Sequence, residues 1–211
     1  MSKPYDPKDA FYRKAKKEGL RARSAFKLEE IAKRFRLFRP GMAVLDLGAA
    51  PGGWLQILAR HVGPKGLVVG VDLQPIRKLG PNVKTLVGDL TAPETVEALL
   101  ALREGRYDAI TSDMAPKTTG IKDVDEARSV ELVRHALALC EKLLEPGGAF
   151  VAKVFEGREF PALLQEIRGA FSGVKLIRPE ATRGRSFEIY VVAIGFRGGG
   201  EDGAARDPEG N

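Results

Sequence analysis

The sequence is poor in the residues that build cross-links and metal centres. Its 211 residues include one cysteine, Cys140, and two histidines, His61 and His135. A single cysteine excludes an internal disulfide and a cysteine-rich metal site, and the two histidines fit no metal-binding spacing. We therefore predict a protein without bound metal, suited to a reducing cytoplasm. We interpret both histidines as surface or packing residues.

Long hydrophobic segments are also missing. No apolar run reaches the length of about 20 residues that a membrane-spanning helix needs, and the first residues, MSKPYDPKDAFYRKAKK, lack the apolar stretch of a secretory signal. Hydrophobic residues still make up 44% of the chain, which is enough for a folded core. We predict a single domain over residues 1–196 without membrane contact, followed by a Gly-rich, charged and disordered tail over residues 197–211.

Positive charge is concentrated at the N-terminus. Residues 1–40 contain 13 Lys and Arg against 5 Asp and Glu, whereas the rest of the chain has 21 against 23. The aromatic residues interleaved with them are Tyr5, Phe11, Tyr12, Phe26, Phe35 and Phe38. Basic side chains attract phosphates and aromatic rings stack on unpaired bases, so this segment is a candidate nucleic-acid surface. A solvated charged face with packing aromatics would give the same composition.

Apolar runs alternate with amphipathic segments along most of the chain. Residues 9–36 are predicted to be helical with a break near Gly19, and Ser24 is the predicted cap of a second helix that ends at Arg36. The pattern further predicts strands at 43–47, 66–71, 83–87, 107–111, 149–154, 174–177 and 187–194, and helices at 54–62, 93–103, 124–144 and 160–171. This order predicts an α/β fold with a mostly parallel sheet and helices on both faces. The link 178–186 is too short for a helical crossover, so the last two strands should be antiparallel neighbours.

A glycine-rich loop, 46–54 (DLGAAPGGW), follows the first predicted strand. Ligands of parallel sheets bind at such ends, where glycines permit close approach and a helix N-terminus faces an anion. Ala50 stands where a dinucleotide fingerprint needs its second glycine, and no Gly-Lys-Ser/Thr follows as in a P-loop. Asp72 and Asp89, at the next two strand ends, could bind ribose hydroxyls and an adenine amino group. These features together fit S-adenosylmethionine, and the alternative is a tight turn with two ordinary loop aspartates.

Three charged residues lie in or beside apolar strands: Asp113, Lys153 and Glu188. A lysine inside a core strand is costly unless it is paired or lies at a site. Methyl transfer to a hydroxyl requires removal of a proton, and a lysine accepts a proton only in its neutral form, which burial and a second cation favour. The three residues predict either an active site or a pair of buried salt bridges, and they do not identify the second cation.

The motifs together carry a family resemblance. KKEGLRARSAFKLEEI, DLGAAPGGW, GVDL, GDL, SDMAP, KVFEG and SFEIY follow one another over about residues 11–190. In these stretches the sequence closely resembles the FtsJ/RrmJ (RlmE) family of bacterial 23S ribosomal RNA uridine-2′-O-methyltransferases. DLGAAPGGW with SDMAP is specific, whereas GVDL or GDL alone is weak. The resemblance implies a Rossmann-like, S-adenosylmethionine-dependent methyltransferase fold with a seven-stranded sheet.

The resemblance also implies roles for particular residues. It places a Lys-Asp-Lys-Glu tetrad at Lys27, Asp113, Lys153 and Glu188, so that Lys27 becomes the second cation and Lys153 the proton acceptor. With the glycine loop it gives the candidate cofactor-binding residues Gly48, Gly52, Gly53, Trp54, Asp72, Asp89 and Asp113. The implied substrate is an A-loop uridine of 23S ribosomal RNA within the 50S subunit, and we expect a monomer. Arg178 and Thr182 depart from the family pattern on a loop, where we expect little effect.

Other activities stay open at this stage. Enzymes that methylate exocyclic amines carry N/D-P-P-Y/F, where this sequence has SDMAP. Methylation of pyrimidine C5 needs a cysteine nucleophile, and Cys140 lies on the apolar stripe of a predicted helix, where we expect a core residue. A non-catalytic RNA-binding assembly factor would not need the whole tetrad. Methylation of transfer RNA or a cap would need it equally, although the compact chain favours ribosomal RNA.

Overall fold

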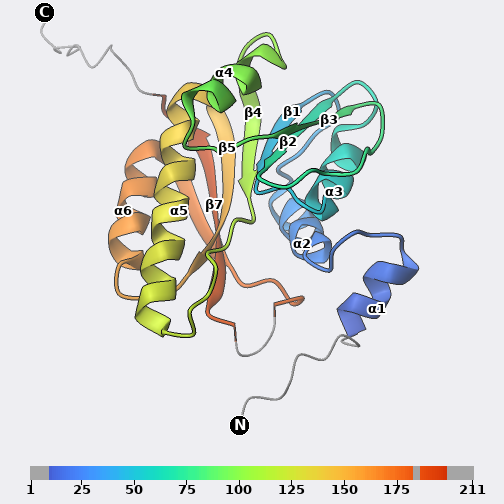
Figure 1. Cartoon of the computed structure of the whole chain (residues 1–211). Coiled ribbons are helices and arrows are strands. Elements are labelled where there is room, and N and C mark those ends of the chain that lie inside the picture. Colours follow the sequence, from blue (N-terminus) through green and yellow to red (C-terminus); the bar gives the residue numbers. More distant parts are fainter. Residues whose placement is uncertain (1–9, 183–185, 199–211) are drawn as a thin grey trace, which may run out of the picture.

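The computed structural model describes residues 10–182 and 186–198, in which a seven-stranded sheet forms the centre (Figure 1). The strands are β1 (Ala43–Leu47), β2 (Leu67–Asp72), β3 (Val83–Val87), β4 (Tyr107–Ser112), β5 (Leu144–Phe155), β6 (Phe171–Ile177) and β7 (Glu188–Phe196). Their order is β3-β2-β1-β4-β5-β7-β6. The pairs among β1 to β5 are parallel, and β7 is antiparallel to both β5 and β6. The predicted mostly parallel sheet and its antiparallel last pair are confirmed.

Helices cover both faces of the sheet (Figure 1). They are α1 (Ala10–Lys17), α2 (Ala25–Phe35), α3 (Gly53–Val62), α4 (Pro93–Ala101), α5 (Lys122–Leu143) and α6 (Phe160–Ala170). The apolar residues of α2 and α3 pack on one face, and those of α4, α5 and α6 pack on the other. None of the helices in the described ranges is both long and apolar enough to cross a membrane.

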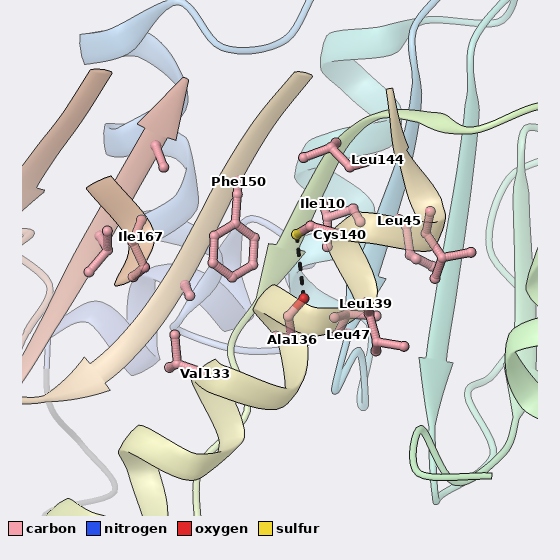
Figure 2. Packing of buried hydrophobic residues seen from close by; sticks show 14 of the residues in the cluster. Leu45, Leu47, Ile110, Val133, Ala136, Leu139, Cys140, Leu144, Phe150 and Ile167 are labelled. Atoms are coloured by element: carbon pink, nitrogen blue, oxygen red, sulfur yellow. Dashed lines mark hydrogen bonds between the residues drawn. The ribbon is translucent and has the colours of Figure 1, made fainter. Parts of the chain in front are cut away.

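The core beneath α5 shows how one helix closes one face of the sheet (Figure 2). Val133 and Cys140 of α5 point toward Ile110 of β4 and Phe150 of β5. The Cys140 thiol is fully buried and donates a hydrogen bond to the carbonyl oxygen of Ala136 at 3.4 Å. Burial raises the pKa of this thiol, which keeps it protonated. The interpretation of Cys140 as a core residue is confirmed.

Two local predictions are wrong, and parts of others lie outside the described residues. Ser24 has helical backbone angles, φ −61° and ψ −18°, and its side chain makes no capping bond, because a cap residue needs an extended backbone. The strand predicted at 149–154 begins earlier, because β5 starts at Leu144 and its register against β4 shifts before Ala149. The predictions for residues 1–9 and for the tail from residue 199 fall outside the described ranges.

Phe150 provides a test of this core. Its ring is fully buried and stacks on Phe171 with 6.0 Å between ring centroids. Phe150→Ala should lower the free energy of unfolding by about 3–5 kcal/mol, because it leaves a cavity between sheet and helices. Leu176→Ala, at a β6 position that is 39% exposed, should cost less than about 1 kcal/mol. Urea unfolding followed by circular dichroism measures both, and equal losses would contradict the assigned core.

Candidate active site

A cavity of about 1010 Å³ opens at the carboxyl ends of the parallel strands. Its volume is sufficient for a small-molecule cofactor. Of the predicted cofactor residues, Gly48, Asp72, Asp89 and Asp113 line it, and the other lining residues include Leu73, Leu90, Met114 and His135. The cavity therefore combines apolar walls with acidic groups from three strand ends.

Gly48 shapes the wall of the cavity between β1 and β4. Its φ of 72° lies in the left-handed region, and a Cβ there would stand 2.6 Å from Cγ of Met114. The backbone N–H groups of Gly48 and Ala49 donate to the carbonyl oxygen of Val71, at 2.9 and 3.1 Å. Only glycine permits this close approach, which attaches the loop to the end of β2.

Two carboxylates at strand ends are held by backbone donors. Asp72 accepts hydrogen bonds from the N–H groups of Ala50 and Gln74, both at 2.9 Å. Asp89 accepts two bonds from Thr91 on one oxygen, and these bonds lower the pKa of Asp89. Both side chains are thus oriented before a ligand arrives, and an oriented, ionised carboxylate can accept hydrogen bonds from ribose hydroxyls or an amino group.

The remaining predicted cofactor residues, Gly52, Gly53 and Trp54, do not line this cavity but lie beneath residues 21–24. A Cβ on Gly52 would stand 3.0 Å from Nη1 of Arg21, and one on Gly53 would stand 2.9 Å from Cβ of Ala22. The indole of Trp54 is 3% exposed and donates from Nε1 to the carbonyl oxygen of Ser24 at 2.9 Å. These three residues therefore contact the N-terminal segment and support the glycine-rich loop from outside the cavity.

Arg21 connects the N-terminal segment to the cofactor loop, a contact that the sequence did not predict. Its guanidinium donates to the carbonyl oxygens of Pro51 at 3.2 Å, Arg77 at 2.7 Å and Lys78 at 2.9 Å. Because every acceptor is a backbone carbonyl oxygen, the residue types at positions 51, 77 and 78 do not indicate the contact. The arginine fixes the glycine loop and the loop after β2 relative to each other.

The four tetrad residues come together from α2, β5, β7 and the residue that follows β4. Nζ of Lys153, on β5, lies 2.9 Å from Oδ1 of Asp113 and donates to the Asp113 carbonyl oxygen at 2.7 Å. Lys27, on α2, forms an ion pair with Glu188, the first residue of β7. Lys27 and Lys153 are only 5% and 8% exposed. Two buried ion pairs therefore lie side by side next to this cavity, which Asp113 also lines.

Tyr190 joins the two ion pairs, a role that the sequence analysis did not predict. Its hydroxyl donates to Oδ1 of Asp113 at 2.9 Å, and Nζ of Lys27 lies 5.7 Å from its ring centroid. Burial, together with the nearby charges of Asp113 and Glu188, raises the pKa of Tyr190 well above its ordinary value. The phenol is therefore a permanent donor that orients Asp113.

The charge of Glu188 depends on its neighbours. Burial alone would raise its pKa, but the charge and hydrogen bond of Lys27 outweigh burial, and Lys153 adds to the effect, so that the pKa of Glu188 is lowered. The Thr182 hydroxyl also donates to Oε1 of Glu188 at 3.2 Å. We expected Thr182 to have little effect, yet it contacts the tetrad.

Asp46 is a further buried acid near the site that the sequence did not single out. It is 1% exposed, and Oγ1 of Thr111 donates to its Oδ1 at 2.7 Å. Its Oδ2 has no hydrogen-bond partner among the described residues. Burial raises the pKa of Asp46 well above its ordinary value despite the bond from Thr111, and the charges of Asp113 and Asp72 raise it further. Asp46 is therefore a buried acid behind the cavity whose surroundings disfavour its charged form.

The two histidines have different surroundings. Nε2 of His61 lies 3.1 Å from Oε2 of Glu29, away from the cavity. His135 lines the cavity, and its Nε2 lies 2.9 Å from the carbonyl oxygen of Leu90. His135 thus forms part of the cavity wall. Across the described ranges, no three His, Cys, Asp or Glu residues are grouped closely enough to hold a metal ion.

The sheet order and the cavity at the strand ends define a Rossmann-like methyltransferase, and comparisons with known proteins give the family. A family model described as FtsJ-like methyltransferase matches residues 20–196. Two relatives are named ribosomal RNA large subunit methyltransferase E. The protein of Anaeromyxobacter dehalogenans is 63% identical over 94% of this chain and 74% of its own length. The protein of Myxococcus xanthus is 55% identical over 92% of this chain and 92% of its own length. A Plasmodium falciparum protein assigned as a ribosomal RNA methyltransferase has a crystal structure with a TM-score of 0.76 at 26% identity, over 84% of this chain and 99% of its own. The chain belongs to the FtsJ-like methyltransferase family, and it is an enzyme that uses S-adenosylmethionine.

The lowered pKa of Glu188 predicts how the ion pair responds to acid. A carboxylate whose folded pKa lies below its ordinary value of 4.5 stabilises the fold above that pH, and the stabilisation is lost as the pH falls through the folded pKa. Glu188→Gln should cost about 3 kcal/mol at neutral pH, because Lys27 stays buried without its partner. The difference from wild type should shrink below about pH 4.5, where the wild type loses the pair as well.

Urea unfolding of both proteins across this pH range measures the difference. Glu141→Gln, at an exposed position of α5, is the matched control and should differ little from wild type at every pH. A Glu188→Gln difference that stays constant down to about pH 3 would show that the ion pair does not set the acid response.

Proposed function

We propose that the protein transfers a methyl group from S-adenosylmethionine to the ribose 2′-hydroxyl of a uridine in the A loop of 23S ribosomal RNA. The observation that carries this proposal is the position of Lys153, held by Asp113 at the edge of the cavity and beside the Lys27–Glu188 pair. The names of the relatives, which refer to the large-subunit ribosomal RNA, support the substrate.

The residues of the cavity fit the cofactor. Asp72 and Asp89 provide oriented carboxylate oxygens for the ribose hydroxyls and the adenine amino group, and Gly48 leaves room beside them. Bound S-adenosylmethionine supplies an electrophilic methyl group on a sulfonium. Asp113 belongs to both the cavity and the tetrad, so it connects the cofactor region to the proton acceptor.

The tetrad supplies the proton chemistry. In its neutral form, Lys153 accepts the proton of the ribose hydroxyl on Nζ, while Asp113 holds that nitrogen in place through its side chain and its carbonyl oxygen. Lys27 is the second cation, and it stabilises negative charge on the ribose oxygen. Glu188 holds Lys27 in position, and the hydroxyl of Thr182 donates to Glu188.

The basic N-terminal segment completes the proposal as the RNA surface. On α1, the side chains of Arg13, Lys14, Lys16 and Lys17 are exposed. Phe11 packs on Phe26 of α2 with 5.9 Å between ring centroids, and this contact attaches α1 to the domain. These two aromatics pack on each other, and the exposed basic side chains of α1 provide its electrostatic attraction for RNA. We further propose that the enzyme acts in the cytoplasm as a monomer, on the RNA within the 50S subunit.

Lys153→Ala should abolish methylation, because no other side chain replaces the proton acceptor, and should leave S-adenosylmethionine binding unchanged. The assay uses large ribosomal subunits from cells that lack this enzyme, followed by mapping of 2′-O-methyl sites, and isothermal titration measures the cofactor. Lys142→Ala, at an exposed position at the end of α5, is the control and should be fully active. Near-normal turnover of Lys153→Ala, or a methyl group on a base, would reject the proposal.

Replacing the four exposed basic residues of α1 by alanine should weaken RNA binding. Each lost phosphate contact should reduce the slope of log K against log salt by about 1. Replacing Lys65 and Lys142, which are exposed near the amino ends of β2 and β5, is the control and should change neither affinity nor slope. Fluorescence anisotropy with labelled RNA at several salt concentrations measures both, and an unchanged slope for the α1 variant would exclude α1 as the RNA surface.

A further inference from the structure

A second cavity, of about 270 Å³, lies next to the tetrad. Its lining residues come from the segment before α5, from the first turns of α5, and from the facing ends of β5 and β7: Thr118, Gly120, Lys122, Asp125, Glu126, Phe155, Ser186 and Phe187. Phe155 pairs with Glu188 across the sheet and stands two residues after Lys153. The second cavity thus adjoins the reactive residues, but it shares no lining residue with the cofactor cavity.

Phe187 presents an aromatic ring that the core does not use. Its side chain is 53% exposed, directly before the tetrad residue Glu188. Nζ of Lys122 lies 4.6 Å from the ring centroid, and the Lys122 side chain is itself 57% exposed. The Phe187 ring is exposed and is covered by the flexible side chain of a lysine. Such a ring is suited to stacking on a base, because every base has an aromatic face.

Glu126 supplies a polar group that lacks a hydrogen-bond donor. It is 6% exposed, and its Oε1 accepts no hydrogen bond from the described residues, although Nζ of Lys122 lies 3.4 Å away as an ion-pair partner. Buried acceptors in folded proteins are nearly always satisfied, so this one is suited to a donor from outside the chain. Gly157 leaves the space for the carboxylate, since a Cβ there would stand 1.8 Å from Oε2 of Glu126.

We propose that this cavity binds a nucleobase of the RNA next to the reactive ribose, stacked on Phe187 and donating an N–H to Glu126. The inference rests on the proposed function, because it needs RNA at the tetrad. In the free protein, Nζ of Lys122 lies 4.6 Å from the Phe187 ring centroid and 3.4 Å from Oε1 of Glu126, so this ammonium covers both groups. The base replaces this ammonium, and the flexible, exposed Lys122 side chain turns to a phosphate of the same strand.

The first experiment compares steady-state methylation of large ribosomal subunits. Phe187→Ala should raise the KM for the subunits about tenfold or more, the effect of losing one base stack, while S-adenosylmethionine affinity stays unchanged. Phe187→Tyr keeps the ring and should retain the wild-type KM. Leu176→Ala, the exposed apolar control on β6, should leave the KM unchanged. An unchanged KM for Phe187→Ala would overturn the stacking contact.

The carboxylate is tested in the same assay. Glu126→Gln should raise the KM about tenfold, because a hydrogen bond to a charged group is replaced by a weaker one. Gly157→Ala should act in the same direction, since its methyl group displaces the Glu126 carboxylate. Glu141→Gln on the same helix is the control. If neither Glu126→Gln nor Gly157→Ala differs from this control, Glu126 is not a base-binding residue.

A direct binding measurement separates this inference from the proposed function. In Phe187→Trp, nucleoside 5′-monophosphates should quench the new indole fluorescence at millimolar concentrations, whereas ribose 5-phosphate, which has no base, should not. The native Trp54 is 3% exposed, so the wild-type protein provides the background. Quenching by nucleotides without methylation of the subunits would keep the base site and reject the methylation proposal. Equal signals from nucleotides and ribose 5-phosphate would overturn the base site.

Discussion

The structure depends on the burial of two ammonium groups beside two carboxylates. Removing a charge from water costs several kcal/mol, and this cost is offset only when a partner and further hydrogen bonds are in place. Lys153 meets this condition through both the side chain and the carbonyl oxygen of Asp113, and Lys27 meets it through Glu188. The pairs contain residues from α2, the end of β4, β5 and β7, so they form only when these elements have packed correctly.

Most of the fold could be predicted from the sequence because its signals are local. The apolar run at 43–47 and the turn residues around it predict β1 with its observed bounds, and the short link before β7 predicts its antiparallel pairing. Local signals failed where tertiary contacts decide. Ser24 has the residue type of a cap but a helical backbone, and β5 begins at Leu144 and not at the predicted residue 149.

The part of the candidate site that could be predicted from the sequence consists of charged residues within apolar strands. Lys153 and Glu188 interrupt core strands, and family resemblance added Lys27. The contacts of Arg21 were not predictable, because its partners are carbonyl oxygens that any residue offers. In the sequence, Tyr190 and Asp46 were not singled out from the other residues of their strands. The packing of neighbouring strands brings Tyr190 to Asp113 and Asp46 to Thr111.

The reversed direction of β7 determines where the chain enters and leaves the catalytic edge. The parallel strands reach that edge with their carboxyl ends, whereas β7 begins there with Glu188 and runs away from it to Phe196, which pairs with Phe171. The described chain therefore leaves the sheet at the rim opposite the cofactor cavity. An affinity tag or a surface tether attached directly after this strand would start at the opposite rim, which leaves the edge with the cavity and the tetrad open when the protein is immobilised.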